Sequence, residues 1–188
     1  MSETPAGTPA HGQEAPSAWV QRWAHLIPVG GTVLDVACGA GRHLRWLAGR
    51  GHPVTGVDRD AQAVAALQDL GEIVVADIEN GPWPFAGRRF AAVVVTNYLW
   101  RPLLPTLIDS VAPGGILLYE TFAAGNETVG RPRNPDFLLR PGELLEATRP
   151  ALRVVAYEDG YVEPPPRFIQ RLAAVREASS GPQVHRLA

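Results

Sequence analysis

The sequence predicts an α/β fold in which a parallel sheet is covered by helices on both faces. From Thr32 onward, short apolar segments alternate regularly with helix-like segments. The apolar segments are hydrophobic along most of their length, which is typical of strands buried on both faces of a sheet. A glycine-rich turn, CGAGRH at 38–43, follows the first apolar segment directly.

Local sequence signals predict each helix and strand. The segment SAWVQRWAHLIP at 17–28 has apolar residues at helical spacing, with Ser17 as the expected N-cap and Pro28 at its end. We expect strands over 32–36, 53–58, 72–77, 90–97 and 116–122, and helices over 41–51, 60–71 and 105–115, each closed by glycine.

The remaining part of the chain predicts one more helix and two more strands. The helix is expected over 140–148, opened by Pro141, and the strands over 152–162 and 168–177, joined by EPPP. A chain of 188 residues suits a single α/β domain. We expect that domain over 17–177, with a disordered tail at 1–16 and a loose tail at 178–188.

Composition excludes several functional classes. The formal net charge of -2 gives no general attraction to nucleic acids or anionic membranes. The single cysteine, Cys38, excludes an intramolecular disulfide and a multi-cysteine metal site, and the histidines lack metal-binding spacing. Residues 1–17 lack the basic start and apolar stretch of a secretory signal. We therefore expect a soluble, cytoplasmic protein without a membrane or metal partner.

The glycine turn departs from the dinucleotide-binding pattern G-x-G-x-x-G. Gly39 and Gly41 supply the first two glycines, but Leu44 occupies the third position, where glycine permits close helix–strand packing. Asp35 lies within the preceding apolar strand, and a buried carboxylate requires partners. Amides of the turn, or a cationic ligand organised through them, would satisfy this carboxylate.

Acidic residues lie at three successive strands, Asp35, Asp58 and Asp77. The carboxyl ends of parallel strands meet at one edge of the sheet, where ligands bind. An acid at the position of Asp58 can accept hydrogen bonds from both hydroxyls of a ribose, in NAD and S-adenosylmethionine alike. Asp77 can accept from an exocyclic adenine amine.

The motifs VLDVACGAGRH, GVDRD, ADIENG, FAAVVVTNYL and PGGILLYETF, in this order, resemble those of class I S-adenosylmethionine-dependent methyltransferases. The form LDVACGAGRHLRWLA is similar to small bacterial enzymes of the tellurite-resistance type. The resemblance covers roughly 17–176. It implies a Rossmann-like, doubly wound, mostly parallel seven-stranded sheet with an antiparallel last strand. The turn then holds the amino-acid end of S-adenosylmethionine and no pyrophosphate.

By position, the resemblance also implies cofactor contacts. Asp35 would organise the methionyl ammonium through the turn, while Arg22 would either pair with the cofactor carboxylate or remain a solvated helix residue. The other cofactor-binding residues that it implies are Ala37, Gly39, Gly41, Asp58, Arg59, Asp77, Ile78 and Asn97.

Two residues are candidates for a catalytic role, Tyr98 and Glu120, which follow or close the fourth and fifth strands. Glu120 would act as a base or accept a hydrogen bond from the substrate; a helix cap or salt bridge is the alternative. For Tyr98 the alternative is aromatic packing. The long loop 123–143 is expected to be either a lid or a solvated connector. Its arginines, Arg131, Arg133 and Arg140, would face an anionic substrate.

These observations predict an S-adenosylmethionine-dependent methyltransferase acting on a small-molecule acceptor by in-line transfer. A nucleic-acid methyltransferase is one alternative, disfavoured by the acidic charge balance. A non-catalytic S-adenosylmethionine-binding partner protein is another. A dinucleotide oxidoreductase is disfavoured by Leu44 and by the buried position expected for Asp35. The identity of the acceptor and the oligomeric state are not predicted.

Overall fold

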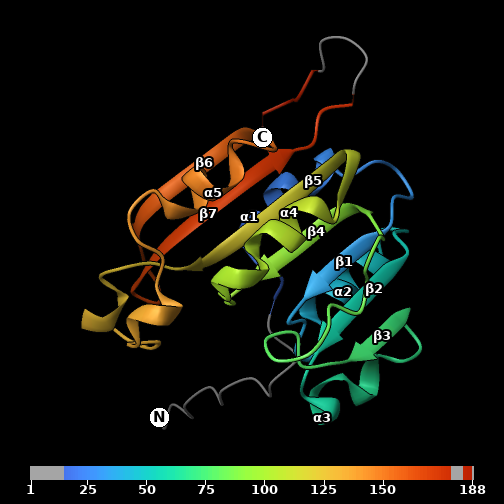
Figure 1. Ribbon diagram of the computed structural model, residues 1–188, viewed down its shortest axis with the longest axis horizontal. Helices are drawn as coiled ribbons and strands as arrows, with labels where there is room; N and C mark the ends of the chain where they lie inside the picture. The colour runs from blue at the N-terminus through green and yellow to red at the C-terminus, as the bar shows by residue number, and fades with distance from the viewer. Residues whose placement is uncertain (1–14, 179–183, 188) are drawn as a thin grey trace, which may run out of the picture.

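The computed structural model describes residues 15–178 and 184–187 of the chain. They form a seven-stranded sheet with the strand order β3-β2-β1-β4-β5-β7-β6 (Figure 1). Strands β1 to β5 pair in parallel, and β7 runs antiparallel to both β5 and β6. The predicted mostly parallel sheet with an antiparallel last strand is thus confirmed. The strands are β1 Val33–Val36, β2 Val54–Asp58, β3 Glu72–Val75, β4 Phe90–Thr96, β5 Val111–Phe122, β6 Arg153–Val162 and β7 Arg167–Val175.

Helices cover both faces of the sheet, as expected for parallel strands. In Figure 1, α1 and α2 lie behind the sheet, and α4 and α5 lie in front of it. The α-helices are α1 Ala18–Trp23, α2 Arg42–Ala48, α3 Ala61–Val64, α4 Leu104–Asp109 and α5 Glu143–Thr148. Short 3₁₀ turns extend or connect them: η1 Ala24–Leu26, η2 Ala65–Leu67, η3 Arg101–Leu103, η4 Asn126–Thr128 and η5 Pro135–Phe137.

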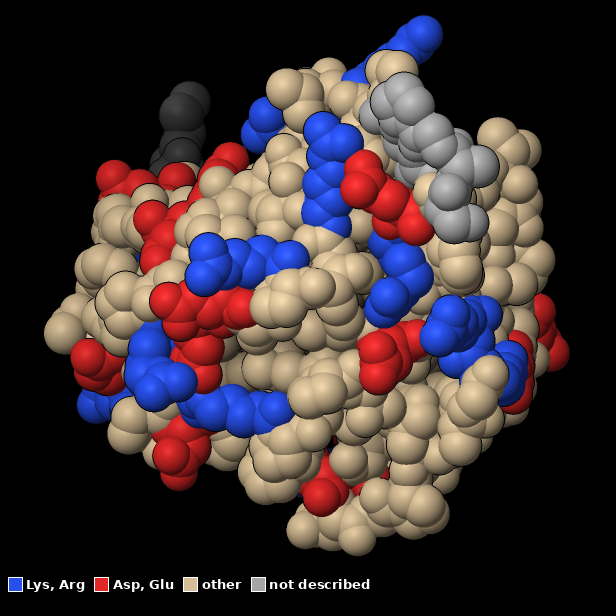
Figure 2. Space-filling view, turned by 45° about the horizontal axis from the view of Figure 1, so that its top comes forward, with Lys and Arg blue, Asp and Glu red and all other residues tan. Residues whose placement is uncertain are grey.

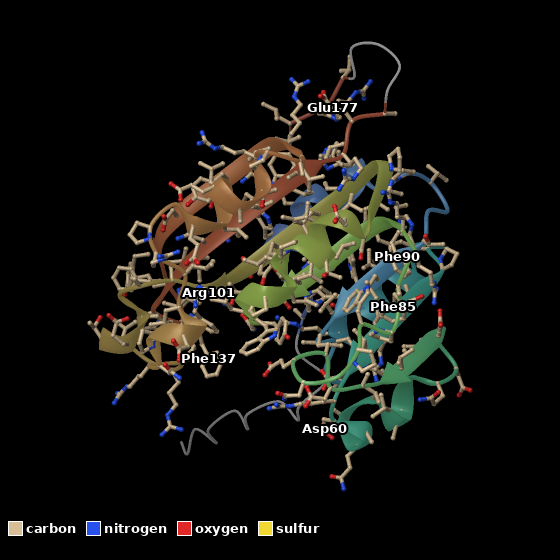
Figure 3. The ribbon with its side chains drawn as sticks, in the orientation of Figure 1. Asp60, Phe85, Phe90, Arg101, Phe137 and Glu177 are labelled. Atoms are coloured by element: carbon tan, nitrogen blue, oxygen red, sulfur yellow. The ribbon has the colours of Figure 1, made fainter. Side chains whose placement is uncertain are left out.

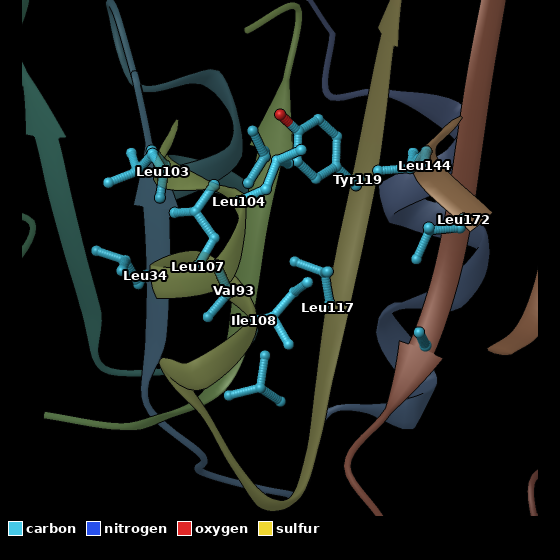
Figure 4. Close-up of a cluster of buried hydrophobic side chains, with 14 of the residues drawn as sticks. Leu34, Val93, Leu103, Leu104, Leu107, Ile108, Leu117, Tyr119, Leu144 and Leu172 are labelled. Atoms are coloured by element: carbon cyan, nitrogen blue, oxygen red, sulfur yellow. The ribbon is translucent and has the colours of Figure 1, made fainter. Parts of the chain in front are cut away.

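Two hydrophobic cores separate the helices from the sheet. In front, Leu107 and Ile108 of α4 pack on Leu117 of β5 and on neighbouring strands (Figure 4). Behind, apolar side chains of α1 and α2 pack against Leu118 and other strand residues. Successive side chains of a strand point to opposite faces, so β5 sends Leu117 forward and Leu118 backward. This alternation decides which face each functional residue of β5 can reach.

Several predicted boundaries differ from the structure. The helix expected over 105–115 ends at Asp109, and β5 already begins at Val111, which pairs with Phe90 of β4. The segment VAPGG suits a strand end better than a helix, because proline and glycine have the lowest helix propensities.

The helices expected over 60–71 and 140–148 are also shorter than predicted. The first consists of the four residues of α3 followed by η2. The second begins at Glu143 and is capped by Gly142 in the left-handed region, with φ +75°, so Pro141 lies outside it. The predicted cap of the first helix is confirmed, since Ser17 Oγ accepts a hydrogen bond from the Trp19 amide at 3.1 Å.

The two tails predicted at 1–16 and 178–188 lie largely outside the described residues. Of the second, 184–187 have no regular secondary structure, and the Arg186 carbonyl lies 3.0 Å from His25 Nε2. The domain boundaries at 17 and 177 therefore stay a prediction. Within the described residues, none of the helices has the length and apolar character needed to span a membrane.

Candidate cofactor and acceptor site

The site is organised by the point at which the strand order reverses. Strands β1 and β4 are neighbours, with β2 and β3 on one side and β5 on the other. In open α/β sheets a crevice forms beyond the carboxyl ends of the strands at this point. The glycine turn follows β1 here and leads into α2, and the loop after β4 begins with Asn97.

The backbone of the turn is left-handed at three alternate residues, Ala37, Gly39 and Gly41, with φ of +52°, +51° and +76°. The two glycines serve different purposes. A Cβ atom on Gly41 would lie 2.6 Å from Leu67 Cδ2, so this glycine permits close packing against η2. A Cβ on Gly39 would meet nothing within 4 Å, so Gly39 borders open space. Of these two glycines, Gly39 is therefore the one that leaves open space beside the backbone.

Leu44, which replaces the third glycine of the dinucleotide pattern, is accommodated by β2. A Cβ atom on Gly56 would lie 2.7 Å from Leu44 Cδ1 and 3.0 Å from Cys38 Sγ. The close helix–strand contact is therefore made by a glycine on the strand instead of one on the helix. Burial, the first cause, and the carboxylates of Asp35 and Asp58 raise the pKa of the Cys38 thiol, so this thiol stays protonated.

Asp35 is only 1% exposed, and its Oδ2 atom has no hydrogen-bond partner among the described residues. The imidazole of His43 in α2 lies beside it, with Nδ1 3.7 Å from Asp35 Oδ2. An unsatisfied buried carboxylate oxygen is costly unless a donor or a cation approaches it. The structure therefore leaves Asp35 in need of a partner at the point where the resemblance places the cofactor ammonium.

Asp58 joins the end of β2 to the glycine turn. Its Oδ2 atom accepts a hydrogen bond from the Gly39 amide at 2.7 Å, and its Oδ1 atom accepts one from the Asp60 amide at 2.9 Å. A carboxylate oxygen can accept more than one hydrogen bond, so both oxygens keep capacity for a ligand hydroxyl. The structure thus brings Asp58 directly beside the turn that follows β1.

Asp77, beyond β3, is exposed and is held by the residues that follow it. Its Oδ1 atom accepts hydrogen bonds from the amides of Glu79 and Asn80 at 3.0 and 3.1 Å, and Oδ2 accepts one from Asn80 Nδ2 at 2.9 Å. The Asn80 side chain is the main reason why the pKa of Asp77 is lowered. Asp77 is therefore a fixed, ionised acceptor. The adjacent Ile78 side chain is buried.

A pocket of about 320 Å³ lies beyond the ends of β2 to β5. Three predicted site residues line it: Arg59, Asn97 and Tyr98. Asn97 has a left-handed backbone with φ +54°, a conformation that asparagine adopts more readily than most residues, and its amide donates to the Glu120 carbonyl at 2.9 Å. The other lining residues are Glu79, Leu99, Thr121, Phe122, Pro132 and Phe137.

Tyr98 presents a neutral hydroxyl in this pocket. Burial, followed by the negative charges of Glu79 and Asp77, raises the pKa of Tyr98 well above its usual value. The hydroxyl oxygen is buried and forms no hydrogen bond that satisfies normal geometry within the described residues. The Tyr119 hydroxyl donates to the Tyr98 carbonyl at 2.9 Å and fixes its backbone. The Glu79 carboxylate, which also raises this pKa as a hydrogen-bonding neighbour, therefore lies beside a Tyr98 hydroxyl that stays protonated.

Glu120 lies on the opposite side of β5 from the pocket and is 3% exposed. Ser17 Oγ donates to Oε1 at 3.0 Å, and Arg171 Nη1 lies 3.3 Å from Oε2. Glu120 is not among the described residues that line the pocket; its neighbour Thr121 is. The geometry thus matches the salt-bridge alternative, and it gives no support to a role as base or substrate acceptor.

Arg22 lies on α1 and packs against aromatic rings. Its guanidinium carbon lies 5.2 Å from the centre of the Trp23 ring, and Nη1 lies 3.6 Å from Glu158 Oε1. The role of Arg22 toward the cofactor carboxylate stays a prediction.

The loop between β5 and α5 forms a lobe beyond the carboxyl ends of β4 and β5 (Figure 1). Arg131 and Arg133 are exposed, and they are not among the described residues that line the pocket. Pro132 and Phe137 line it instead; Phe137 is labelled in Figure 3. Arg140 pairs with Glu143 at 3.3 Å, so it belongs to the base of the loop.

Sequence reasoning missed two kinds of site residue. Pro132 and Phe137 belong to the loop 123–143, in which the arginines were the predicted substrate contacts. His43 does not stand out in the sequence, because it lies within the turn and shows no metal-binding spacing. Its proximity to Asp35 follows from the packing of α2 on β1, and the only signal in the sequence is its place on the first turn of that helix.

Comparison with known proteins finds similarity to methyltransferases, over part of the sequence and in the fold. Residues 33–115 match the methyltransferase domain family. TehB from Haemophilus influenzae has a similar fold, with 21% sequence identity, a TM-score of 0.65 and coverage of 82% of this chain; the chain spans 60% of TehB. No curated protein matches the chain in sequence.

Two further structures share the fold. A TehB-like S-adenosylmethionine-dependent methyltransferase from Corynebacterium glutamicum is 19% identical, with a TM-score of 0.61 over 85% of this chain and 87% of that protein. A protein that takes part in converting a disulfide bond into a thioacetal group during echinomycin biosynthesis is 17% identical, with a TM-score of 0.65 over 88% of this chain and 84% of that protein.

Proposed function

We propose that the chain is a class I S-adenosylmethionine-dependent methyltransferase that transfers the methyl group of this cofactor to a small-molecule acceptor. The match of residues 33–115 to the methyltransferase domain family and the fold shared with a TehB-like S-adenosylmethionine-dependent methyltransferase support the proposal. One observation carries the proposal: Asp35, Asp58 and Asp77 lie at or just beyond the ends of three adjacent strands, and Asp58 is bonded to the glycine turn. Arg59 and Glu79, which follow Asp58 and Asp77 closely in the chain, line the pocket.

The residues present fit the cofactor. The unsatisfied Oδ2 atom of Asp35 suits the methionyl ammonium, and the open space at Gly39 admits a ligand against the backbone. Asp58 would hold the ribose hydroxyls, and Asp77 and Ile78 would contact the adenine edge. Ala37, Gly41, Arg59 and Asn97 would complete the cofactor site, and Arg22 would reach the cofactor carboxylate.

S-adenosylmethionine supplies an electrophilic methyl group on a sulfonium whose leaving group is a neutral thioether. The task of the protein is to align the acceptor behind that methyl group. Tyr98, which lies in the pocket wall beside Asn97, would orient the acceptor through its neutral hydroxyl. A thiolate or another anionic acceptor needs no base, because no proton has to be removed.

Pocket size and surface charge favour a small acceptor. The pocket of about 320 Å³ lies within the usual range for small-molecule sites and has Phe137 and Pro132 in its wall. On the face drawn in Figure 2, basic and acidic side chains are intermingled, unlike the basic patch of a nucleic-acid enzyme. Arg131 and Arg133 would attract an anionic acceptor from the exposed loop. The similarity to a protein of echinomycin biosynthesis also favours a small acceptor.

Calorimetric titration with S-adenosylhomocysteine, with NAD as the control, tests the cofactor. We expect saturable binding of S-adenosylhomocysteine alone; binding of neither ligand would overturn the proposal. Radiolabelled S-adenosylmethionine then tests the acceptor class, with thiols and small anions in one set of reactions and duplex DNA and RNA in another. Label transferred only to nucleic acid would contradict the small-molecule assignment.

A further inference from the structure

A buried chain of polar contacts joins the start of α1 to the carboxylate at the end of β1. The backbone amide of Ser17 donates a hydrogen bond to His43 Nε2 at 3.1 Å. The other nitrogen of this imidazole, Nδ1, lies 3.7 Å from Asp35 Oδ2. His43 is 2% exposed and Asp35 1% exposed, so water does not screen these contacts. Ser17 is held in place from its side chain as well, because its Oγ donates to Glu120.

The contact with Ser17 fixes the tautomer of His43. A backbone N–H can only donate, so Nε2 must present its lone pair and the imidazole must be uncharged. A neutral imidazole carries one proton, which is then on Nδ1, the nitrogen beside Asp35. A carboxylate can only accept, and the Oδ2 atom of Asp35 has no hydrogen-bond partner among the described residues. The tautomer selected by Ser17 is therefore the one that places a proton on the imidazole nitrogen beside Asp35 Oδ2.

We propose that His43 is a positioning residue of the cofactor site, which orients Asp35 and couples the binding of S-adenosylmethionine to the docking of residues 15–17. This inference rests on the proposed function, in which Asp35 organises the cofactor ammonium. Ser17 selects the Nδ1-protonated tautomer, that tautomer holds Asp35, and Asp35 holds the ligand. Because such coupling is reciprocal, a bound cofactor stabilises the contact between Ser17 and His43 in return.

Variants of His43 separate this role from simple packing. His43→Leu fills the buried space without polar atoms, whereas His43→Gln keeps an acceptor for Ser17 and a donor for Asp35. His52→Leu is the matched control, because His52 also bonds a backbone group, the Gly31 carbonyl at 3.0 Å, but precedes β2 at the opposite edge of the sheet. Circular dichroism and thermal melting establish that each variant is folded.

In titrations with S-adenosylhomocysteine, we expect His43→Leu to raise Kd about tenfold or more, which corresponds to about 1.4 kcal/mol. His43→Gln should recover most of the affinity, and His52→Leu should leave it unchanged. A folded His43→Leu variant that binds as tightly as the natural protein overturns the inference. If the natural protein itself does not bind the ligand, the proposed function has failed, which is a distinguishable result.

Two measurements test the coupling without relying on catalysis. Nitrogen NMR of the imidazole should show His43 protonated at Nδ1 in the free protein; protonation at Nε2 overturns the inference. Hydrogen exchange of the Ser17 amide should slow when S-adenosylhomocysteine is added to the natural protein and to His43→Gln, but not to His43→Leu. Equal slowing in His43→Leu, or no slowing in the natural protein, shows that docking and ligand binding are independent.

Discussion

Arg101 and Glu143 form a two-point ion pair, with Nε 2.7 Å from Oε1 and Nη2 2.9 Å from Oε2. The same guanidinium donates to the carbonyls of Asp136 and Leu138 at 2.7 and 2.8 Å. Arg101 therefore ties η3 to the end of the loop after β5 and to the first residue of α5; it is labelled in Figure 3. The pair fixes the part of the loop that brings Phe137 to the pocket.

We expect Glu143→Gln to lower the free energy of unfolding by about 2–3 kcal/mol, because it leaves the partly buried Arg101 without its counter-charge. Glu72→Gln is the matched control, since Glu72 forms an equally close two-point pair with Arg88 at the surface. An exposed pair contributes about 0–1 kcal/mol. Chemical denaturation of the two variants measures the difference, and equal losses would show that the Arg101 pair is no more stabilising than a surface one.

The same carboxylate predicts a dependence of stability on pH. Hydrogen bonds from Arg101, the first cause, lower the pKa of Glu143 from 4.5 to about 2. A lowered pKa means that the unfolded chain takes up the proton first as the pH falls. The stabilisation, on the order of 3 kcal/mol, is therefore complete above pH 4.5 and lost between about pH 4.5 and 2.

Unfolding free energies of the natural protein and Glu143→Gln, measured from neutral to acid pH, check this prediction. The gap between them should narrow only below about pH 4.5, because glutamine cannot take up the proton. A gap that stays constant down to pH 3 would show that Glu143 is not the titrating group.

Asp58→Ala should weaken binding of S-adenosylhomocysteine roughly 10- to 100-fold, as expected when a charged hydrogen-bond acceptor is removed. The control is Asp60→Ala, which removes the N-cap of α3 through its contacts with the Gln62 and Ala63 amides. That variant should lose about 1 kcal/mol of stability and keep its affinity. Calorimetry and thermal melting of both proteins give the comparison; unchanged affinity in Asp58→Ala would remove this residue from the site.

The sequence was sufficient to predict the sheet and the turn, because both depend on local patterns. Uniformly apolar strands and glycines at 39 and 41 are visible without any tertiary contact. The extent of α4 was predicted wrongly, since Val111 joins β5 only through its pairing with Phe90.

Contacts between distant segments explain what the sequence did not predict in the site. Glu120 forms an ion pair with Arg171, which lies 51 residues away in the chain. His43 accepts a hydrogen bond from the amide of Ser17, which lies 26 residues away. Spacing within a motif cannot predict either contact, because each depends on how α1 and β7 pack around β5. The position of Phe137 in the pocket wall likewise depends on the hydrogen bonds that Arg101 donates to the carbonyls of Asp136 and Leu138.

Alanine substitutions at the two glycines of the turn, Gly39 and Gly41, distinguish an effect on folding from an effect on ligand binding. Both have left-handed backbones, so alanine at either position costs about 1–2 kcal/mol from the conformation alone. Only Gly41 has a steric constraint in addition, because its Cβ would lie within 3 Å of both methyl groups of Leu67.

We therefore expect Gly41→Ala to unfold at lower denaturant concentration than Gly39→Ala, since the buried Leu67 side chain must shift to admit the methyl group. Gly39→Ala should keep most of its stability, because its Cβ meets nothing within 4 Å. That open space is where the proposed function places the cofactor, so Gly39→Ala should lose affinity for S-adenosylhomocysteine far beyond its loss of stability. Denaturation and calorimetry on both variants decide the matter: a folded Gly39→Ala protein with unchanged affinity would mean that the ligand does not approach the turn there.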